Sequence, residues 1–125
     1  VGITGSFGKT STKYIVNTIL SQKYNTLMTP ESYNTTMGVV RTINEKLSST
    51  HQIFVCEMGA KYVGDIKEIC DVVLPSYCII TDVGNMHLDT FKNIENVANK
   101  YLRNKEINNK NMITKNCNFS IIYFC

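Results

Sequence analysis

The chain has 125 residues, of which 43% are hydrophobic and 18% are charged, values typical of one globular domain. It contains no run of about 18 or more apolar residues, so we do not expect a membrane-spanning helix. The net charge is only +3 and the 13 basic residues are scattered, which gives little support for a nucleic-acid partner.

The five cysteines predict free thiols. They are odd in number, lie mostly in apolar runs and form no C-x-x-C pair. We therefore expect buried thiols instead of disulfides or a zinc site, which favours a reducing, cytoplasmic location. The sequence starts at Val1 without a signal segment, and only residues 1–3 precede a glycine-rich loop, so we expect a truncated amino terminus within a longer protein.

Strand-like and helical segments alternate along the chain. The β-rich runs lie at about 1–3, 25–28, 52–56 and 77–81, and helical periodicity lies at about 10–22, 36–47, 63–73 and 94–105. This alternation predicts an α/β fold with a mainly parallel sheet flanked by helices. In such sheets, ligands bind beyond the carboxyl ends of the strands.

Two of the predicted helices have an apolar side. In the first, this side is formed by Ile15, Val16, Ile19 and Leu20, with Thr12, Lys13 and Asn17 elsewhere; in the second, it is formed by Val39, Val40, Ile43 and Leu47. After Asn104 the chain becomes rich in asparagine and lysine. We therefore expect an incomplete nucleotide-binding domain at 1–104 and an irregular tail at 105–125, which is either a further strand or sequence unrelated to the domain.

The run GITGSFGKT at residues 2–10 predicts a phosphate-binding loop. Such a loop needs glycines that turn backbone N–H groups inward, a lysine for the terminal phosphates and a hydroxyl for magnesium. Gly5, Gly8, Lys9 and Thr10 meet these needs. The strict pattern G-x-x-x-x-G-K-[ST] places its first glycine at Ile3, whereas this chain has Gly2, so the loop is a variant that is one residue longer.

The alternative is a glycine-rich turn with an incidental lysine. The order of strand, loop, Gly-Lys-Thr and amphipathic helix favours nucleotide binding. We expect ATP to contact Thr4, Gly5, Ser6, Gly8, Lys9, Thr10 and Ser11.

Two further residues follow predicted strands. Glu57 ends the run that starts at Gln52, where a carboxylate can hold the magnesium that bridges nucleotide phosphates; the alternative is a solvated surface charge. His87 lies past the fourth strand, and its position fits a structural hydrogen-bonding residue as well as a ligand. His51 follows Ser48-Ser49-Thr50 and is interpreted as structural.

These motifs together resemble the ATP-binding central domain of the Mur ligase family. The resemblance covers Val1 to about Lys100 and rests on the loop, on SYNTTMGV at 32–39, on EMGA at 57–60 and on VGDI at 63–66. The last two segments are more similar to the branch that adds D-alanyl-D-alanine than to the other branches. In the family, the segment that matches Asn34 and Thr35 faces the γ-phosphate and the substrate.

The resemblance implies a reaction and roles for individual residues. The carboxylate of a UDP-N-acetylmuramoyl-tripeptide attacks the γ-phosphate of ATP, and the amine of D-alanyl-D-alanine then displaces phosphate from the acyl phosphate, a step of peptidoglycan synthesis. Lys9 and Asn34 would act on the transferred phosphoryl group. Thr10 and Glu57 would hold one Mg²⁺, and His87 a second.

The match is weaker at the family's carbamylated lysine. The spacing after Ile94-Glu95-Asn96 differs from the family pattern, so neither lysine matches it fully. Lys100 is the better counterpart and Lys105 the second choice. The alternatives are another Mur ligase, a folylpolyglutamate synthase-type ligase, or an inactive nucleotide-binding remnant. We expect the 125 residues by themselves to be inactive in ligation.

Overall fold

The computed structural model describes residues 1–62, 64–81 and 120–123. In chain order they form β1 (Gly2–Thr4), α1 (Lys9–Leu20), β2 (Thr26–Met28), α2 (Thr36–Lys46), β3 (Ile53–Glu57), α3 (Asp65–Val73), β4 (Tyr77–Ile80) and β5 (Ser120–Tyr123). Each element predicted within residues 1–81 is present, with slightly different ends. The predicted helix at 94–105 lies outside the described residues. No helix in the described part is long and apolar enough to cross a membrane.

The strands form one parallel sheet in the order β2-β3-β1-β4-β5. The short strand β1 lies in the middle, where Ile3 pairs with Glu57 of β3 on one side and with Ile79 of β4 on the other. The predicted α/β fold with a parallel sheet is therefore confirmed. The loop after β1 must emerge between the carboxyl ends of β3 and β4, where open sheets of this kind bind ligands.

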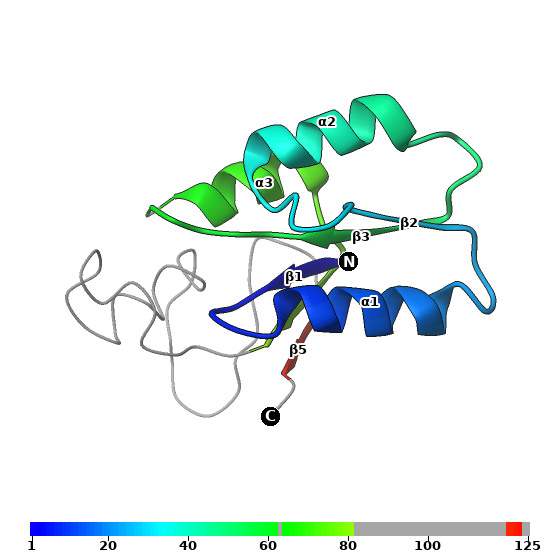
Figure 1. The fold of residues 1–125 in the computed structure, drawn as a ribbon, viewed down its shortest axis with the longest axis horizontal. Helices are drawn as coiled ribbons and strands as arrows, with labels where there is room; N and C mark the ends of the chain where they lie inside the picture. The colour runs from blue at the N-terminus through cyan, green and yellow to red at the C-terminus, as the bar shows by residue number, and fades with distance from the viewer. Residues whose placement is uncertain (63, 82–119, 124–125) are drawn as a thin grey trace.

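The helices cover both faces of the sheet. The connection from β1 to β2 runs toward one edge of the sheet, whereas the connections from β2 to β3 and from β3 to β4 run the opposite way. Because crossovers between parallel strands are right-handed, α1 lies on one face and α2 and α3 lie on the other. Figure 1 shows α1 alone below the sheet and the other two helices above it.

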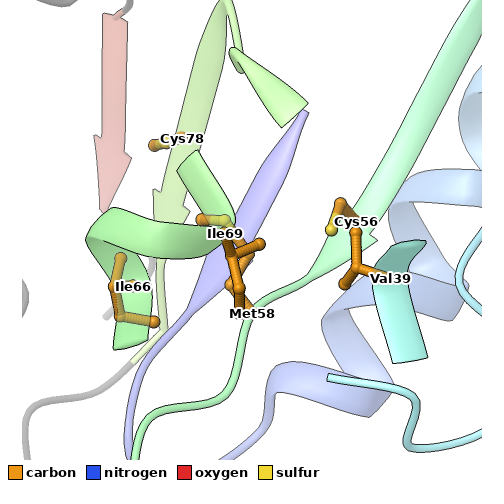
Figure 2. Close-up of a cluster of buried hydrophobic side chains, with 6 residues drawn as sticks. All are labelled: Val39, Cys56, Met58, Ile66, Ile69 and Cys78. Carbon is orange, nitrogen blue, oxygen red and sulfur yellow. The ribbon is translucent and has the colours of Figure 1, made fainter. Parts of the chain in front are cut away.

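Each face of the sheet has its own apolar cluster. Ile3, Val55 and Ile79 are buried on the α1 face, where Val16 and Leu20 of α1 pack against this cluster. The opposite cluster, drawn in Figure 2, consists of Val39, Cys56, Met58, Ile66, Ile69 and Cys78. Neighbouring residues of a strand point to opposite faces. Glu57, two residues after Val55, therefore belongs to the α1 face.

The predicted apolar side of α1 is partly wrong. Val16 and Leu20 face the core, but Ile15 and Ile19 are 59% and 65% exposed, and Lys13 is fully buried instead. Residues 13, 16 and 20 share one side of a helix. That side faces the sheet because Lys13 meets a buried carboxylate there, so hydrophobicity alone misjudged the rotation of α1.

The predicted stripe of α2 is correct for Val39 and Ile43, but Val40 is only half-buried and is not part of the cluster. Val39 is buried and Ile43 packs against the same cluster, whereas Leu47 is 41% exposed just beyond the end of the helix. Thr42 is buried, and its hydroxyl donates a hydrogen bond to the Gly38 carbonyl at 2.8 Å. This internal partner allows a polar side chain on the core-facing side.

The described cysteines are free thiols. Cys56 and Cys78 are buried and Cys70 is half-buried, while Cys117 and Cys125 lie outside the described residues. Burial raises the pKa of the Cys56 thiol to about 12, so this side chain stays protonated and behaves as a small apolar group.

Candidate functional site

The loop between β1 and α1 has the backbone of an anion site. Gly5 and Gly8 have φ angles of 140° and 76°, a left-handed range that favours glycine. Gly8 is also the N-cap of α1 and has no side chain that could occupy the free N–H groups of the first turn. The positive end of the α1 dipole therefore points at the space beside the loop, where it favours a phosphate group.

Lys9 folds back over this loop. Its Nζ donates hydrogen bonds to the carbonyl oxygens of Gly5 at 2.8 Å and Ser6 at 3.2 Å. Burial lowers the pKa of the ammonium group from its ordinary value, although the nearby Glu57 carboxylate acts in the opposite direction. Carbonyl contacts are weaker than a contact with phosphate, so Lys9 can exchange them for an anionic ligand.

Glu57 is the buried carboxylate of the site, with an exposed fraction of only 1%. Its Oε1 accepts hydrogen bonds from Thr10 Oγ1 of α1 and from Asn34 Nδ2 of the β2–α2 loop, both at 3.1 Å. Its backbone N–H donates to Thr29 Oγ1 at 3.0 Å. The alternative of a solvated surface charge is therefore wrong, and three predicted site residues lie together.

Lys13 is the residue that the sequence reasoning missed. Its Nζ lies 3.1 Å from Glu57 Oε2, and both side chains are almost completely buried. The same Nζ donates to the backbone carbonyl of Glu31. The contact with Oε2 is an ion pair without hydrogen-bond geometry. The available signal was spacing, because a lysine three residues after Thr10 lies on the same side of the helix.

Asn34 is held in place by Gly59. The Gly59 N–H donates to the Asn34 carbonyl at 2.6 Å, and a Cβ atom added at Gly59 would lie only 2.7 Å from the Asn34 side chain. Only glycine leaves room for the Asn34 amide beside the end of β3. This contact explains physically why a glycine follows the Glu-Met pair.

Thr81 was also missed, and it holds the other side of the loop. Its hydroxyl donates to the Phe7 carbonyl at 2.5 Å, and its backbone N–H donates to the Thr4 carbonyl at 2.9 Å. The phosphate loop is thus bounded by the end of β3 on one side and by the end of β4 on the other.

The other residues predicted for the site differ in their burial and hydrogen-bond partners, and some lie outside the described part of the chain. Thr4 Oγ1 donates to the Met58 carbonyl at 3.0 Å, and Thr35 Oγ1 caps α2 by accepting from the Gly38 N–H at 3.3 Å. Ser6 is buried within the loop and Ser11 is exposed on the first turn of α1. His87 and Lys100, as well as the alternative Lys105, lie outside the described residues.

The donor set fits one magnesium ion bound together with phosphate. A hydroxyl oxygen and a carboxylate oxygen, 3.1 Å apart at Thr10 and Glu57, are hard ligands of the kind that Mg²⁺ prefers. The described residues contain no group of three or more His, Cys, Asp or Glu side chains that could hold a metal unaided.

Comparison with known proteins gives one consistent family. Residues 3–114 match the Mur ligase middle domain. The chain is 39% identical over 88 residues to a UDP-N-acetylmuramoyl-tripeptide--D-alanyl-D-alanine ligase of Synechocystis sp., covering 70% of this chain and 19% of that protein. It is 34% identical over 98 residues to the enzyme of the same name from Borreliella burgdorferi, covering 78% and 21%.

Solved structures agree with the sequence matches. A crystal structure of MurF from Acinetobacter baumannii superposes with a TM-score of 0.76 at 34% identity, covering 81% of this chain and 22% of that one. The MurF ligase from Thermotoga maritima in complex with ADP gives the same TM-score and identity, covering 81% and 23%. The chain therefore spans about a fifth of the length of these relatives.

Proposed function

The chain belongs to the Mur ligase family, and we propose that it supplies the ATP-binding part of a ligase that joins D-alanyl-D-alanine to UDP-N-acetylmuramoyl-tripeptide. One observation carries the proposal: Thr10 and Glu57 meet at 3.1 Å beside the helix that begins at the Gly-Lys-Thr motif. A hydroxyl and a carboxylate at that position are the protein ligands that a nucleotide-bound Mg²⁺ needs.

The proposed reaction gives the residues of the site separate tasks. The loop amides and Lys9 bind the β- and γ-phosphates and stabilise the charge on the γ-phosphoryl group as its bond to ADP breaks and it moves to the tripeptide carboxylate. Asn34 Nδ2, next to the same carboxylate, is placed to orient the γ-phosphate. When bound, Mg²⁺ neutralises phosphate charge. The amine of D-alanyl-D-alanine then displaces phosphate from the acyl phosphate, and an amide bond forms.

Two assignments extend this proposal to other residues, and one concerns the location of the protein. Thr4, Ser6, Ser11 and Thr35 line the nucleotide, and His87 and Lys100 support a second magnesium ion. We infer a cytoplasmic location, because Cys56, Cys70 and Cys78 are free thiols, as is usual in a reducing compartment.

The nucleotide site is tested by calorimetry of the 125-residue chain with Mg-ADP. Lys9→Ala should weaken binding by roughly 10- to 100-fold, the effect of losing a charge-assisted hydrogen bond. Lys23→Ala is the matched control, because it removes an exposed lysine just beyond α1. Equal affinities of the wild type and Lys9→Ala would contradict the loop assignment.

A further inference from the structure

Lys13 is a buried cation for which the proposed phosphate chemistry has no use. Its side chain is fully buried, and it lies on α1 one turn beyond the residues that face the phosphates. A buried ammonium group is strongly unfavourable unless it is paired. Its partners are the Glu57 carboxylate, at 3.1 Å, and the Glu31 carbonyl.

The contacts divide the Glu57 carboxylate into two halves. Oε1 points to Thr10 and Asn34, which both donate to it at 3.1 Å. Oε2 points to Lys13 and accepts no hydrogen bond from the described part of the chain. Only Oε1 is therefore next to the hydroxyl that can share a magnesium ion, while Oε2 is held by charge.

The charges explain what this arrangement does. Lys13 cancels the charge of Glu57, and Lys9 adds a further positive charge close to the same carboxylate. Without nucleotide, the positive charge of Lys9 repels an approaching divalent cation. The Glu57 carboxylate does not offset this repulsion, because Lys13 already neutralises it. Nucleotide phosphates reverse the sign of the local charge, so the cation and the nucleotide should bind together.

Building on the proposed nucleotide site, we propose that Lys13 is a positioning residue that holds Glu57 by Oε2, presents Oε1 to the metal and makes cation binding depend on bound nucleotide. Lys13 acts through its contacts with Glu57 Oε2 and the Glu31 carbonyl, without itself serving as a ligand of phosphate or metal. Its contact with the Glu31 carbonyl also ties the β2–α2 loop, which carries Asn34, to the same carboxylate. One buried lysine thus links α1, β3 and this loop.

The test measures Mn²⁺ binding to the 125-residue chain by electron paramagnetic resonance at about pH 8, with and without ADP. In the wild type, Mn²⁺ should bind at least about 100-fold more tightly with ADP than alone. In Lys13→Met, the Glu57 carboxylate loses the positive charge that offsets it, so Mn²⁺ alone should bind about tenfold more tightly. The ratio between the two affinities should fall accordingly.

Two further variants complete the experiment. Lys23→Met removes the same charge from an exposed position and should leave the ratio unchanged. If Lys13→Met does not fold, as judged by circular dichroism, Lys13→Gln replaces it, since its amide can still donate to Glu57 without a charge. Failure of both variants to fold would overturn the positioning role, because Lys13 would then be a requirement of the fold.

The outcomes separate the inference from the function on which it rests. A folded Lys13 variant that binds Mn-ADP but shows an unchanged ratio would overturn the role of Lys13 alone. A purely structural lysine would produce that result, since loss of packing gives no gain in cation affinity. If the wild type bound neither ADP nor Mn-ADP, the proposed function would be wrong.

Discussion

Glu57 shows how much depends on a single side chain in this site. It is 1% exposed and contacts Thr10, Asn34 and Lys13, which come from two other segments of the chain. Removing one partner of a buried ion pair typically costs about 3–5 kcal/mol, because the remaining charge is left without compensation. The exposed pair of Lys67 and Asp71 on α3 contributes little by comparison.

At the same scale, Lys9 should make nucleotide affinity sensitive to alkaline pH. Burial lowers its pKa, so the free protein loses this proton at a lower pH than an ordinary lysine would. Phosphate favours the charged form, and Mg-ADP affinity should therefore fall as the pH rises through the lowered pKa, with proton uptake on binding. Calorimetry from about pH 7 to 10 measures both effects.

The control for this pH dependence is Lys9→Ala. The variant lacks the titrating group, so its weaker affinity should change much less over the same pH range. Parallel pH profiles for the wild type and the variant would assign the effect to another group.

At the scale of elements, the site is built where the ends of three segments meet. β1 delivers the phosphate loop, β3 delivers Glu57, and the β2–α2 loop delivers Asn34. The close approach at Gly59 fixes the last of these, since the Gly59 N–H holds the Asn34 carbonyl at 2.6 Å. The position of Asn34 therefore depends on the absence of a side chain on another element.

Gly59→Ala should push the β2–α2 loop away from β3. The added Cβ would lie 2.7 Å from the Asn34 side chain and 3.0 Å from its carbonyl oxygen. We expect a loss of about 1–3 kcal/mol in the free energy of unfolding, as for other overpacked sites, measured by urea denaturation. Mg-ADP affinity should fall as well, because Asn34 leaves Glu57.

The double variant Asn34→Ala/Gly59→Ala provides the control. Removal of the Asn34 side chain relieves part of the crowding. The double variant should therefore lose less unfolding free energy than the sum of the losses in the two single variants. Additive effects would show that the strain from a Cβ at Gly59 does not act through Asn34.

At the scale of the whole molecule, the described residues form a parallel sheet flanked by helices, with the proposed nucleotide site at one edge. The 125 residues correspond to about a fifth of the length of the relatives that they resemble. Ligation requires the carboxylate, γ-phosphate and amine in near-attack geometry, and a misplacement of about 1 Å can cost on the order of a hundredfold in rate. Nucleotide binding and ligation should therefore separate in this chain.

A polypeptide limited to these 125 residues should bind Mg-ADP but not join the two substrates. The measurement is phosphate release from ATP in the presence of UDP-N-acetylmuramoyl-tripeptide and D-alanyl-D-alanine. Turnover close to that of a full-length homologue would contradict the prediction. Recovery of turnover when the other domains of a homologue are added would support it. The predicted division of the chain into a nucleotide-binding domain at 1–104 and a tail at 105–125 also stays a prediction.

The sequence by itself determined the features that depend on local pattern. The alternation of β-rich and helical segments predicted the parallel α/β sheet, and the Gly-Lys-Thr motif predicted the glycine-rich loop that joins β1 to α1, whose binding of phosphate stays a prediction. Glu57 could be found because it ends an apolar run, and the carboxyl ends of parallel strands meet at one edge of the sheet. The roles of His87 and Lys100 stay predictions, since both lie outside the described residues.

Only the tertiary structure decided which side of α1 is buried and what surrounds Glu57. Hydrophobicity placed Ile15 and Ile19 inside and Lys13 elsewhere, yet Lys13 is buried because a carboxylate 44 positions further along the sequence lies beneath it. The contacts of Thr81 with the loop and of Gly59 with Asn34 also join distant segments. Periodicity describes each element alone, whereas the pairing of buried charges depends on how the elements are brought together.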